Sequence, residues 1–325
     1  MPRSFRISVE TGDAFACDAD VLVLKYAQNL YGVDKAAYGL LTKAGVKLQL
    51  PIEGAFALTD TRRSMRPKSA LFVGVVTLQN FSYLQIRDFA RHALEFLADT
   101  GCNAQSVALT VHGPGYGLDE LEAFRSEFAG VVDAATNGNV PEALNSVVFI
   151  EADPRRATRL QRSLTQLCPR GVVVVDDGGA LETKAQTALR TVGYASSSKS
   201  HVFVAMPFAP EMDDVFHYGI QGAVNAAGLL CERADLSSFT GDVVNWVKTR
   251  ISSASLVIAD LSSANPNVYL EVGYAWGREV PTVLLARDEH ELKFDTKGHR
   301  CILYRSIKNL EDLLSKELRT LPDRH

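Results

Sequence analysis

The chain has 325 residues and a formal net charge of −4 at pH 7, with 46% hydrophobic and 22% charged residues. This profile is typical of a globular protein of about two ordinary domains. The negative charge argues against a general nucleic-acid binder, which usually carries a basic face, but not against nucleotide ligands. No apolar run approaches the roughly 20 residues that a membrane span needs.

The cysteines and the N-terminus indicate a cytoplasmic protein. Cys17, Cys102, Cys168, Cys231 and Cys301 are scattered and form no C-x-x-C pair. Neither a zinc site nor a disulfide framework is expected, so we expect small buried side chains in a reducing compartment. The opening residues, MPRSFRISVE, lack the apolar core of a signal peptide.

Strands and helices alternate along the first half of the chain. Apolar runs predict buried strands, and apolar residues spaced by three or four predict helices. The expected strands are 21–24, 71–76, 107–111 and 147–150, and the expected helices are 83–97, 118–135 and 157–167. This alternation predicts a sheet covered by helices.

The middle of the chain is expected to join two domains. Residues 172–175 are all valine and predict one more strand, and Asp177-Gly178-Gly179 predicts a turn. The serine-rich run 196–200 is typical of an exposed linker, so we place the boundary there. The expected organisation is an N-terminal domain over 1–168, a linker region over 169–199 and a C-terminal domain over 200–325.

The second half repeats the alternation of strands and helices. The expected strands are 202–205, 229–231, 256–259 and 282–285, and the expected helices are 215–227, 243–251, one from about 267, and 310–318. Parallel neighbours need crossover connections, and these helices are long enough to supply them. The series predicts a doubly wound parallel sheet.

Polar side chains gather where strand 256–259 ends and the next helix begins. Asp260 ends the strand, and Asn265 followed by Pro266 has the pattern of an N-cap and a first helical residue. Glu271 then lies about one and a half turns into the helix. In open α/β sheets, ligands bind at this edge of the sheet.

Small residues follow Glu271 in the same helix. We expect Gly273 and Ala275 to let that helix pack closely on the sheet.

An acidic, amide-rich site without a cation suits chemistry on a sugar. Cleavage of an N-glycosidic bond builds positive charge on the ribose, and a carboxylate beside C1′ can stabilise that charge or form an ester. Glu271 and Asp260, with Asn267, fit these roles. The same residues also fit ordinary capping and a favourable helix-dipole interaction, so spacing alone leaves a structural interpretation open.

The segment resembles the nucleoside 2-deoxyribosyltransferases and the related bacterial TIR-like domains. Their signature is an apolar strand ending in Asp, then Asn-Pro-Asn-Val, then an aromatic-x-Glu-x-Gly-Tyr-Ala helix, here 257–260, 265–268 and 269–275. Further matching motifs stand in the family's order at 205–208, 213–216, 232–235, 294–295 and 300–304. The resemblance covers about 202–304.

The resemblance implies roles for individual residues. Glu271 would be the catalytic carboxylate, and Asp260 and Asn267 would hold the ribose or position the leaving base. Three of the residues also have a structural interpretation. Phe208 fits a core position, Arg233 fits a structural ion pair, and Asn265 fits a residue that shapes the turn. The implied substrate contacts are Met206, Pro207, Phe208, Arg233, Asp235 and Asn265.

The first half carries a glycine-rich loop between a strand and a helix, at 112–120. Such a loop presents N–H groups that suit a diphosphate, although a tight turn without a ligand fits as well. Together with Gly12-Asp13, 20–24 and 26–34, this loop loosely resembles a macro domain, a module that binds ADP-ribose, over about 6–167. The resemblance implies a mixed sheet with flanking helices. The implied ligand contacts are Asp13, Asn29, Gly113, Gly115, Tyr116 and Gly117.

The sequence differs from the macro domain family at the end of one strand. The family usually has paired asparagines where this chain has Lys25-Tyr26-Ala27-Gln28-Asn29. This departure argues against ADP-ribose hydrolysis. It leaves open ligand binding, or a degenerate scaffold related to the N-terminal domain of leucyl aminopeptidases.

Together the two resemblances imply a cytoplasmic effector. The macro-like domain would bind a nucleotide-like activating ligand, and the TIR-like domain would hydrolyse NAD to ADP-ribose and nicotinamide, without a metal or resident cofactor. Bacterial proteins that join such domains commonly serve in antiphage defence as homo-oligomers. Base exchange on deoxynucleosides and a non-catalytic nucleotide-binding or assembly module remain as alternatives. We expect neither membrane association nor direct nucleic-acid binding.

Overall fold

The computed structural model describes residues 3–175, 183–233, 243–288 and 301–320, which belong to two compact units. Unit 1 is Met1–Pro114 with Glu120–Ser197, and unit 2 is Gly115–Asp119 with Ser198–His325. The chain therefore passes between the units three times, at 114–115, 119–120 and 197–198.

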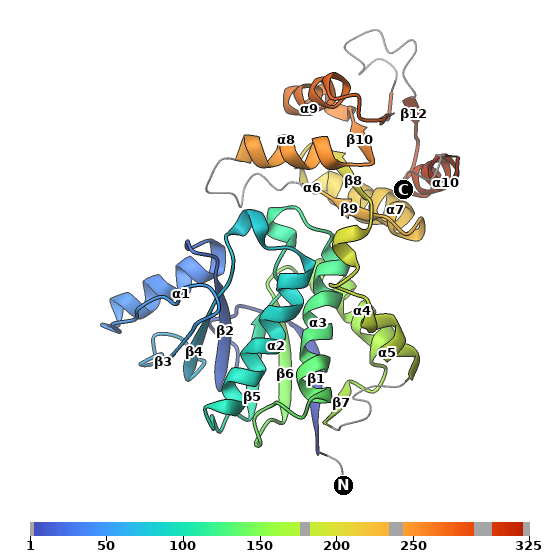
Figure 1. The fold of residues 1–325 in the computed structure, drawn as a ribbon. Coiled ribbons are helices and arrows are strands. Elements are labelled where there is room, and N and C mark those ends of the chain that lie inside the picture. The colour runs from blue at the N-terminus through green and yellow to red at the C-terminus, as the bar shows by residue number, and fades with distance from the viewer. Residues whose placement is uncertain (1–2, 176–182, 234–242, 289–300, 321–325) are drawn as a thin grey trace. The chain divides into compact units, whose positions relative to one another are not determined.

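Unit 1 is built on a mixed sheet of seven strands in the order β3-β4-β2-β5-β6-β1-β7 (Figure 1). The five inner strands run parallel, while the edge strands β3 and β7 run antiparallel to their neighbours. This confirms the expected mixed sheet. The strands are β1 (Arg3–Thr11), β2 (Val21–Tyr26), β3 (Phe56–Asp60), β4 (Ser69–Gly74), β5 (Ser106–Thr110), β6 (Ser146–Glu151) and β7 (Val172–Val175).

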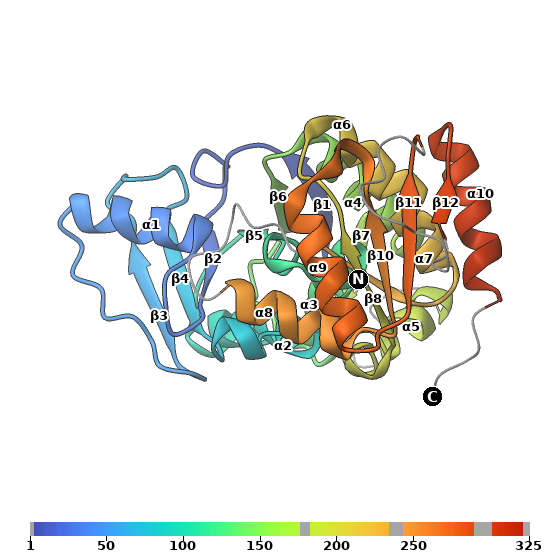
Figure 2. The same ribbon diagram turned by 90° about the horizontal axis from the view of Figure 1, so that it is seen from above.

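Helices cover both faces of this sheet. Ala37 and Leu41 of α1 pack in one cluster with Leu22, Leu24 and Phe72 of the sheet. Figure 2 shows α1 and α2 on opposite faces. The helices are α1 (Gly32–Lys43), α2 (Tyr83–Asp99), α3 (Glu120–Thr136), α4 (Pro154–Leu167) and α5 (Thr183–Arg190).

A buried arginine joins three segments of unit 1. The Arg87 guanidinium on α2 donates to both carboxylate oxygens of Asp133 on α3, at 2.6 and 2.7 Å. It also donates to the carbonyl of Leu189 in α5, at 2.8 Å. The region 169–199, expected as a linker, thus carries β7 and α5, and its residues up to Ser197 group with unit 1.

Unit 2 is built on five parallel strands in the order β12-β11-β10-β8-β9. The first strand of the unit, β8, lies inside the sheet, and the chain adds β9 on one side before β10, β11 and β12 on the other. This confirms the doubly wound parallel sheet. The strands are β8 (His201–Ala205), β9 (Leu230–Glu232), β10 (Leu256–Asp260), β11 (Thr282–Ala286) and β12 (Cys301–Leu303).

Alternate residues of these strands face two layers of helices, as the two-residue period of a strand requires. Ala205, Val257 and Ala259 pack in one cluster with residues of α8 and α9, whereas Val204 and Ile258 pack in another with residues of α6, α7 and α10. Figure 2 shows α9 and α10 on opposite sides of β10 to β12. The helices are α6 (Pro210–Asp214), a π-helical stretch (Val215–Gln221), α7 (Gly222–Ala226), α8 (Val243–Ser253), α9 (Pro266–Gly277) and α10 (Ile307–Leu318).

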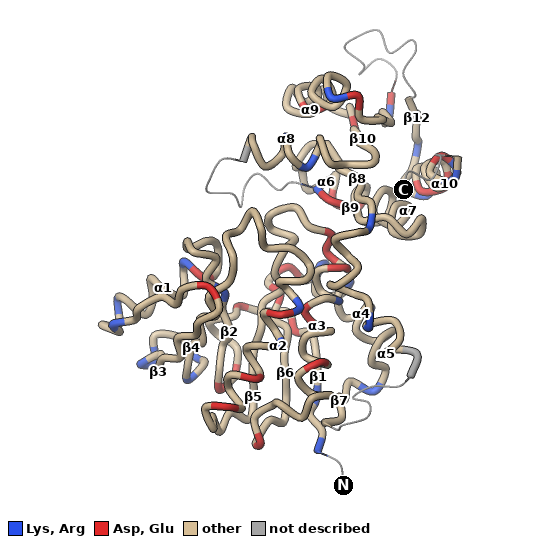
Figure 3. The backbone as a smooth tube through the Cα atoms, in the orientation of Figure 1, with Lys and Arg blue, Asp and Glu red and all other residues tan. Residues whose placement is uncertain are grey.

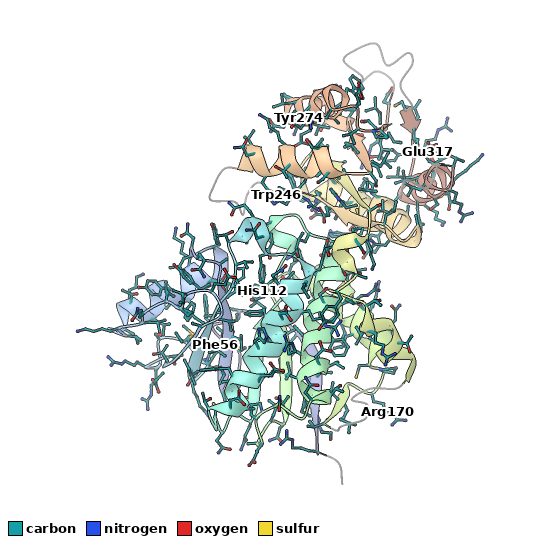
Figure 4. All side chains as sticks on the ribbon, in the orientation of Figure 1. Phe56, His112, Arg170, Trp246, Tyr274 and Glu317 are labelled. Atoms are coloured by element: carbon teal, nitrogen blue, oxygen red, sulfur yellow. The ribbon has the colours of Figure 1, made fainter. Side chains whose placement is uncertain are left out.

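The short segment Gly115–Asp119 completes the edge of this sheet. The edge strand β9 would otherwise leave N–H groups unpaired. Instead the Cys231 N–H donates to Asp119 Oδ2 at 2.9 Å, and the N–H of Arg233, just beyond the strand, donates to the Gly117 carbonyl at 3.2 Å. A Cβ at Gly117 would lie 2.2 Å from the Trp246 ring of α8, a residue labelled in Figure 4.

Figure 3 shows Lys and Arg interspersed with Asp and Glu along both units. In the described ranges, no helix combines the length and the apolar character needed to cross a membrane.

The close contact of α2 and α3 depends on a glycine. A Cβ at Gly130 would lie 2.1 Å from the Arg87 carbonyl oxygen, so Gly130→Ala must push the helices apart. We expect the free energy of unfolding to fall by about 3 kcal/mol in denaturant titrations. Gly39→Ala in α1 is the matched control, because a Cβ there meets nothing within 4 Å. Equal effects of the two changes would contradict the prediction.

Candidate active site

The carboxyl ends of all five strands of unit 2 lie at one edge, because the strands are parallel. Asp260 ends β10, and the residues that follow the other strands are Met206, Arg233, Arg287 and Tyr304. The strand order reverses between β8 and β10, and open α/β sheets bind ligands at such a switch point.

Asp260 is fully buried, and both of its carboxylate oxygens accept hydrogen bonds. The backbone N–H of Ser262 donates to Oδ1 at 2.9 Å, and the Tyr304 hydroxyl donates to Oδ2 at 2.7 Å. Burial, with the adjacent Asp260 charge, raises the pKa of Tyr304 to about 12. Tyr304 therefore stays protonated and keeps donating at neutral pH.

The turn after Asp260 leads into α9 as expected. Asn265 is the N-cap, its Oδ1 accepts from the Asn267 N–H at 2.9 Å, and Pro266 is the first helical residue. This confirms the predicted capping. The Asn267 side chain is exposed near the start of the helix, where a ligand can reach it.

Glu271 has a different environment from Asp260. It is partly buried on α9, beside Val268 and Val272, which pack against the sheet. Within the described ranges no hydrogen bond or ion pair involves its carboxyl group, and burial raises its pKa to about 7. A carboxyl group that changes charge near neutral pH is common at functional sites.

The glycine of the same helix does not face the sheet. Ala275 is fully buried, as expected, but Gly273 is exposed and a Cβ there would meet nothing within 4 Å. The expectation that Gly273 permits close packing is therefore wrong. At about 100° per residue, position 273 points away from the face that 268, 272 and 275 share.

The expected substrate contacts that follow β8 and β9 lie together. Met206 and Pro207 are buried, whereas Phe208 is 46% exposed and is not a core residue. The Arg233 guanidinium carbon lies 4.0 Å from the Phe216 ring centre and 5.2 Å from that of Phe208. Asp235, also expected here, lies outside the described residues.

Arg233 combines this aromatic stacking with an ion pair. Its Nη2 lies 3.6 Å from Asp213 Oδ1, and its Nη1 lies 3.8 Å from the Met206 sulfur. The arginine thus links the strand end, the loop after β8 and the next helix.

Sequence reasoning missed Arg287, Tyr304 and Ser262 as parts of this edge. The Arg287 Nε donates to the Tyr304 hydroxyl oxygen at 3.3 Å, and its backbone N–H donates to Ser262 Oγ at 3.3 Å. Arg287 and Arg233 show that the edge is not free of cations, which corrects the expectation. The available signal was that Arg287 and Tyr304 each directly follow an apolar strand.

The expected ligand contacts of unit 1 follow strands that run parallel. Asp13, Asn29 and Gly113 follow β1, β2 and β5. Asp13 Oδ1 accepts from the Phe15 N–H at 2.9 Å, and Asn29 Oδ1 accepts from the Leu30 N–H at 2.8 Å. Both side chains shape their own loops while remaining exposed.

The other expected contacts, Gly115, Tyr116 and Gly117, group with unit 2. A cavity of about 510 Å³ in unit 1 is lined by residues of β1, β5 and β6, with Cys17, Asp18, Ala19 and Gly171, and includes none of the expected contacts.

Two buried pairs occupy the ends of β2 and β5. Lys25 Nζ lies 2.5 Å from Asp34 Oδ2, and His112 Nδ1 lies 3.2 Å from Glu127 Oε1. Burial raises the pKa of Glu127 well above its usual range, and burial with the nearby Lys25 charge lowers that of His112. His112, labelled in Figure 4, lies inside unit 1. Lys25, which begins the segment that differs from the macro domain family, thus belongs to a buried polar cluster.

The raised pKa of Glu271 predicts a pH-dependent stability. The folded protein holds this proton up to about pH 7, whereas the ordinary pKa is 4.5, so wild type loses stability as the pH rises between these values. We expect Glu271→Gln to be more stable than wild type at pH 8 by about 1–3 kcal/mol, and the difference to disappear near pH 4.5. Thermal melts at both pH values measure this. Glu279→Gln, at an exposed carboxylate just beyond α9, is the matched control.

No protein-family model and no curated protein matches the chain. Similar solved structures include a Trypanosoma brucei macrodomain in complex with ADP-ribose (16% identity, TM-score 0.39, 49% of this chain and 69% of that chain). An Oceanobacillus iheyensis macrodomain with ADP has 14% identity and a TM-score of 0.38 over 51% of this chain and 97% of that chain. A Clostridium botulinum CMP N-glycosidase has 17% identity and a TM-score of 0.31 over 36% of this chain and 99% of that chain.

Proposed function

We propose that the chain is an enzyme that cleaves the N-glycosidic bond of a nucleotide, with Glu271 as the reacting carboxylate. The proposed substrate is NAD, and the products are ADP-ribose and nicotinamide. The observation that carries the proposal is the Glu271 carboxyl group. It is partly buried, has no hydrogen-bond partner in the described part of the chain, and has a pKa raised to about 7.

The proposed reaction uses the ionised form of Glu271. The bond between C1′ and the nicotinamide nitrogen breaks, and its electron pair leaves with the nitrogen, which becomes neutral. The carboxylate stabilises the positive charge that develops on the ribose, or attacks C1′ to form an ester. Water then adds at C1′, displacing the carboxylate where an ester has formed. It gives up one proton to solvent, and ADP-ribose is released. Because nicotinamide leaves as a neutral molecule, no acid is needed.

Other residues of the edge support binding in this proposal. The exposed Asn267 amide is available to ribose hydroxyls, and the exposed Phe208 ring offers a flat surface for a base. Asp260 acts through the turn that carries α9, since both of its oxygens are already bonded.

We further propose that unit 1 controls this activity. Asp13, Asn29 and Gly113 follow parallel strands, at the edge where α/β sheets bind ligands, so a nucleotide-like activator is the proposed ligand. An oligomeric effector in antiphage defence is the corresponding biological proposal.

The central test compares wild type with Glu271→Gln in a nicotinamide-release assay with NAD. We expect the variant to lose activity by roughly 1000-fold or more, because the amide carries no negative charge. Since an effector can be silent before activation, NAD is also measured in cells that express each form, and only wild type should deplete it. Glu279→Gln is the control. Equal NAD cleavage by wild type and Glu271→Gln would show that the assignment is wrong.

Base exchange on deoxynucleosides is the second candidate, and one observation favours it. With a pKa of about 7, Glu271 is also protonated in part at neutral pH and can supply a proton to a leaving base. Incubation with a deoxynucleoside and a free base would then yield a new nucleoside, at a rate that falls as the pH rises through 7. NAD cleavage should instead rise about tenfold per pH unit below pH 7 and level off above it.

A further inference from the structure

Arg287 stands at the same edge of unit 2 as the candidate catalytic residues. It is the first residue after β11, and its side chain is exposed. β11 pairs with β10 so that Leu285 lies opposite Asp260, and the Leu285 carbonyl accepts from the Leu261 N–H at 2.8 Å. Arg287 therefore lies beside the turn that carries α9 and Glu271.

The arginine is held in place by its surroundings. Its Nε donates to the Tyr304 hydroxyl oxygen at 3.3 Å, and its Nη2 lies 3.9 Å from the Met212 sulfur. Tyr304 is in turn fixed by the buried Asp260 at 2.7 Å. An exposed arginine ordinarily loses rotamer freedom when it binds a ligand, and these contacts reduce that loss in advance.

Arg233, another guanidinium of this edge, is placed differently. It stacks on Phe216, lies 3.6 Å from Asp213, and its side chain is only 15% exposed. Its contacts suit the positioning of the loop after β8. Arg287, by contrast, is exposed and lies next to the turn.

We propose that Arg287 binds the 5′-phosphate of the substrate, so that the site selects nucleotides over unphosphorylated nucleosides. This inference rests on the proposed cleavage of a ribosyl bond. A planar guanidinium offers paired donors that match phosphate oxygens, and the 5′-phosphate is joined to the same ribose whose C1′ reacts. The phosphate contact therefore fixes the sugar relative to Glu271.

The experiment uses two substrates that contain the same glycosidic bond. Nicotinamide mononucleotide carries the 5′-phosphate and nicotinamide riboside lacks it. We expect wild type to prefer the mononucleotide in kcat/KM, and Arg287→Gln to lose about 30-fold or more for the mononucleotide alone, mainly through KM. Arg287→Lys should recover part of the loss, because it keeps the charge without the paired donors. Arg278→Gln, at an exposed arginine at the far end of α9, is the matched control.

Calorimetric binding of both compounds separates this inference from the proposed reaction. If neither compound is cleaved, the proposed reaction fails, but tighter binding of the mononucleotide that disappears in Arg287→Gln still supports the phosphate contact. Equal losses for both substrates, or mononucleotide binding that Arg287→Gln leaves unchanged, would overturn it.

Discussion

A carboxylate removed from water needs hydrogen-bond donors, and Asp260 meets this requirement with donors from two distant parts of unit 2. The Ser262 N–H fixes the turn that leads into α9, and the Tyr304 hydroxyl fixes the chain after β12. β11 lies between β10 and β12, so the exposed Arg287 joins the same network through its bond to Tyr304. One buried charge thus organises three strand ends and the helix that carries Glu271.

The parts of this site that depend on neighbouring residues could be predicted from the sequence. The capping by Asn265 and Pro266, the strand that ends in Asp260 and the position of Glu271 early in a helix all follow from local patterns. The order of the strands in the sheet cannot be predicted from such local patterns. Arg287 and Tyr304 join the site only because β11 and β12 lie next to β10 in the sheet, and nothing local to either residue specifies that.

The difference between local patterns and long-range contacts also decides how much of the fold could be predicted. Alternating apolar runs predicted most strands and helices of both units, and hence the α/β class. The grouping of Gly115–Asp119 with unit 2 depends on bonds to Cys231 and Arg233, more than a hundred residues later in the chain. The membership of 189–192 in unit 1 likewise depends on Arg87 in α2. Such long-range partners are set by the packed structure as a whole.

Because Gly117 and Asp119 cover the edge of β9, unit 2 is not encoded by one continuous stretch of gene. A fragment that starts at residue 198 lacks the acceptors for the Cys231 and Arg233 N–H groups, and its sheet ends in an open edge prone to pairing with other chains. Unit 2, which carries the proposed catalytic site, therefore cannot be moved intact to another protein unless residues 115–119 are moved with it.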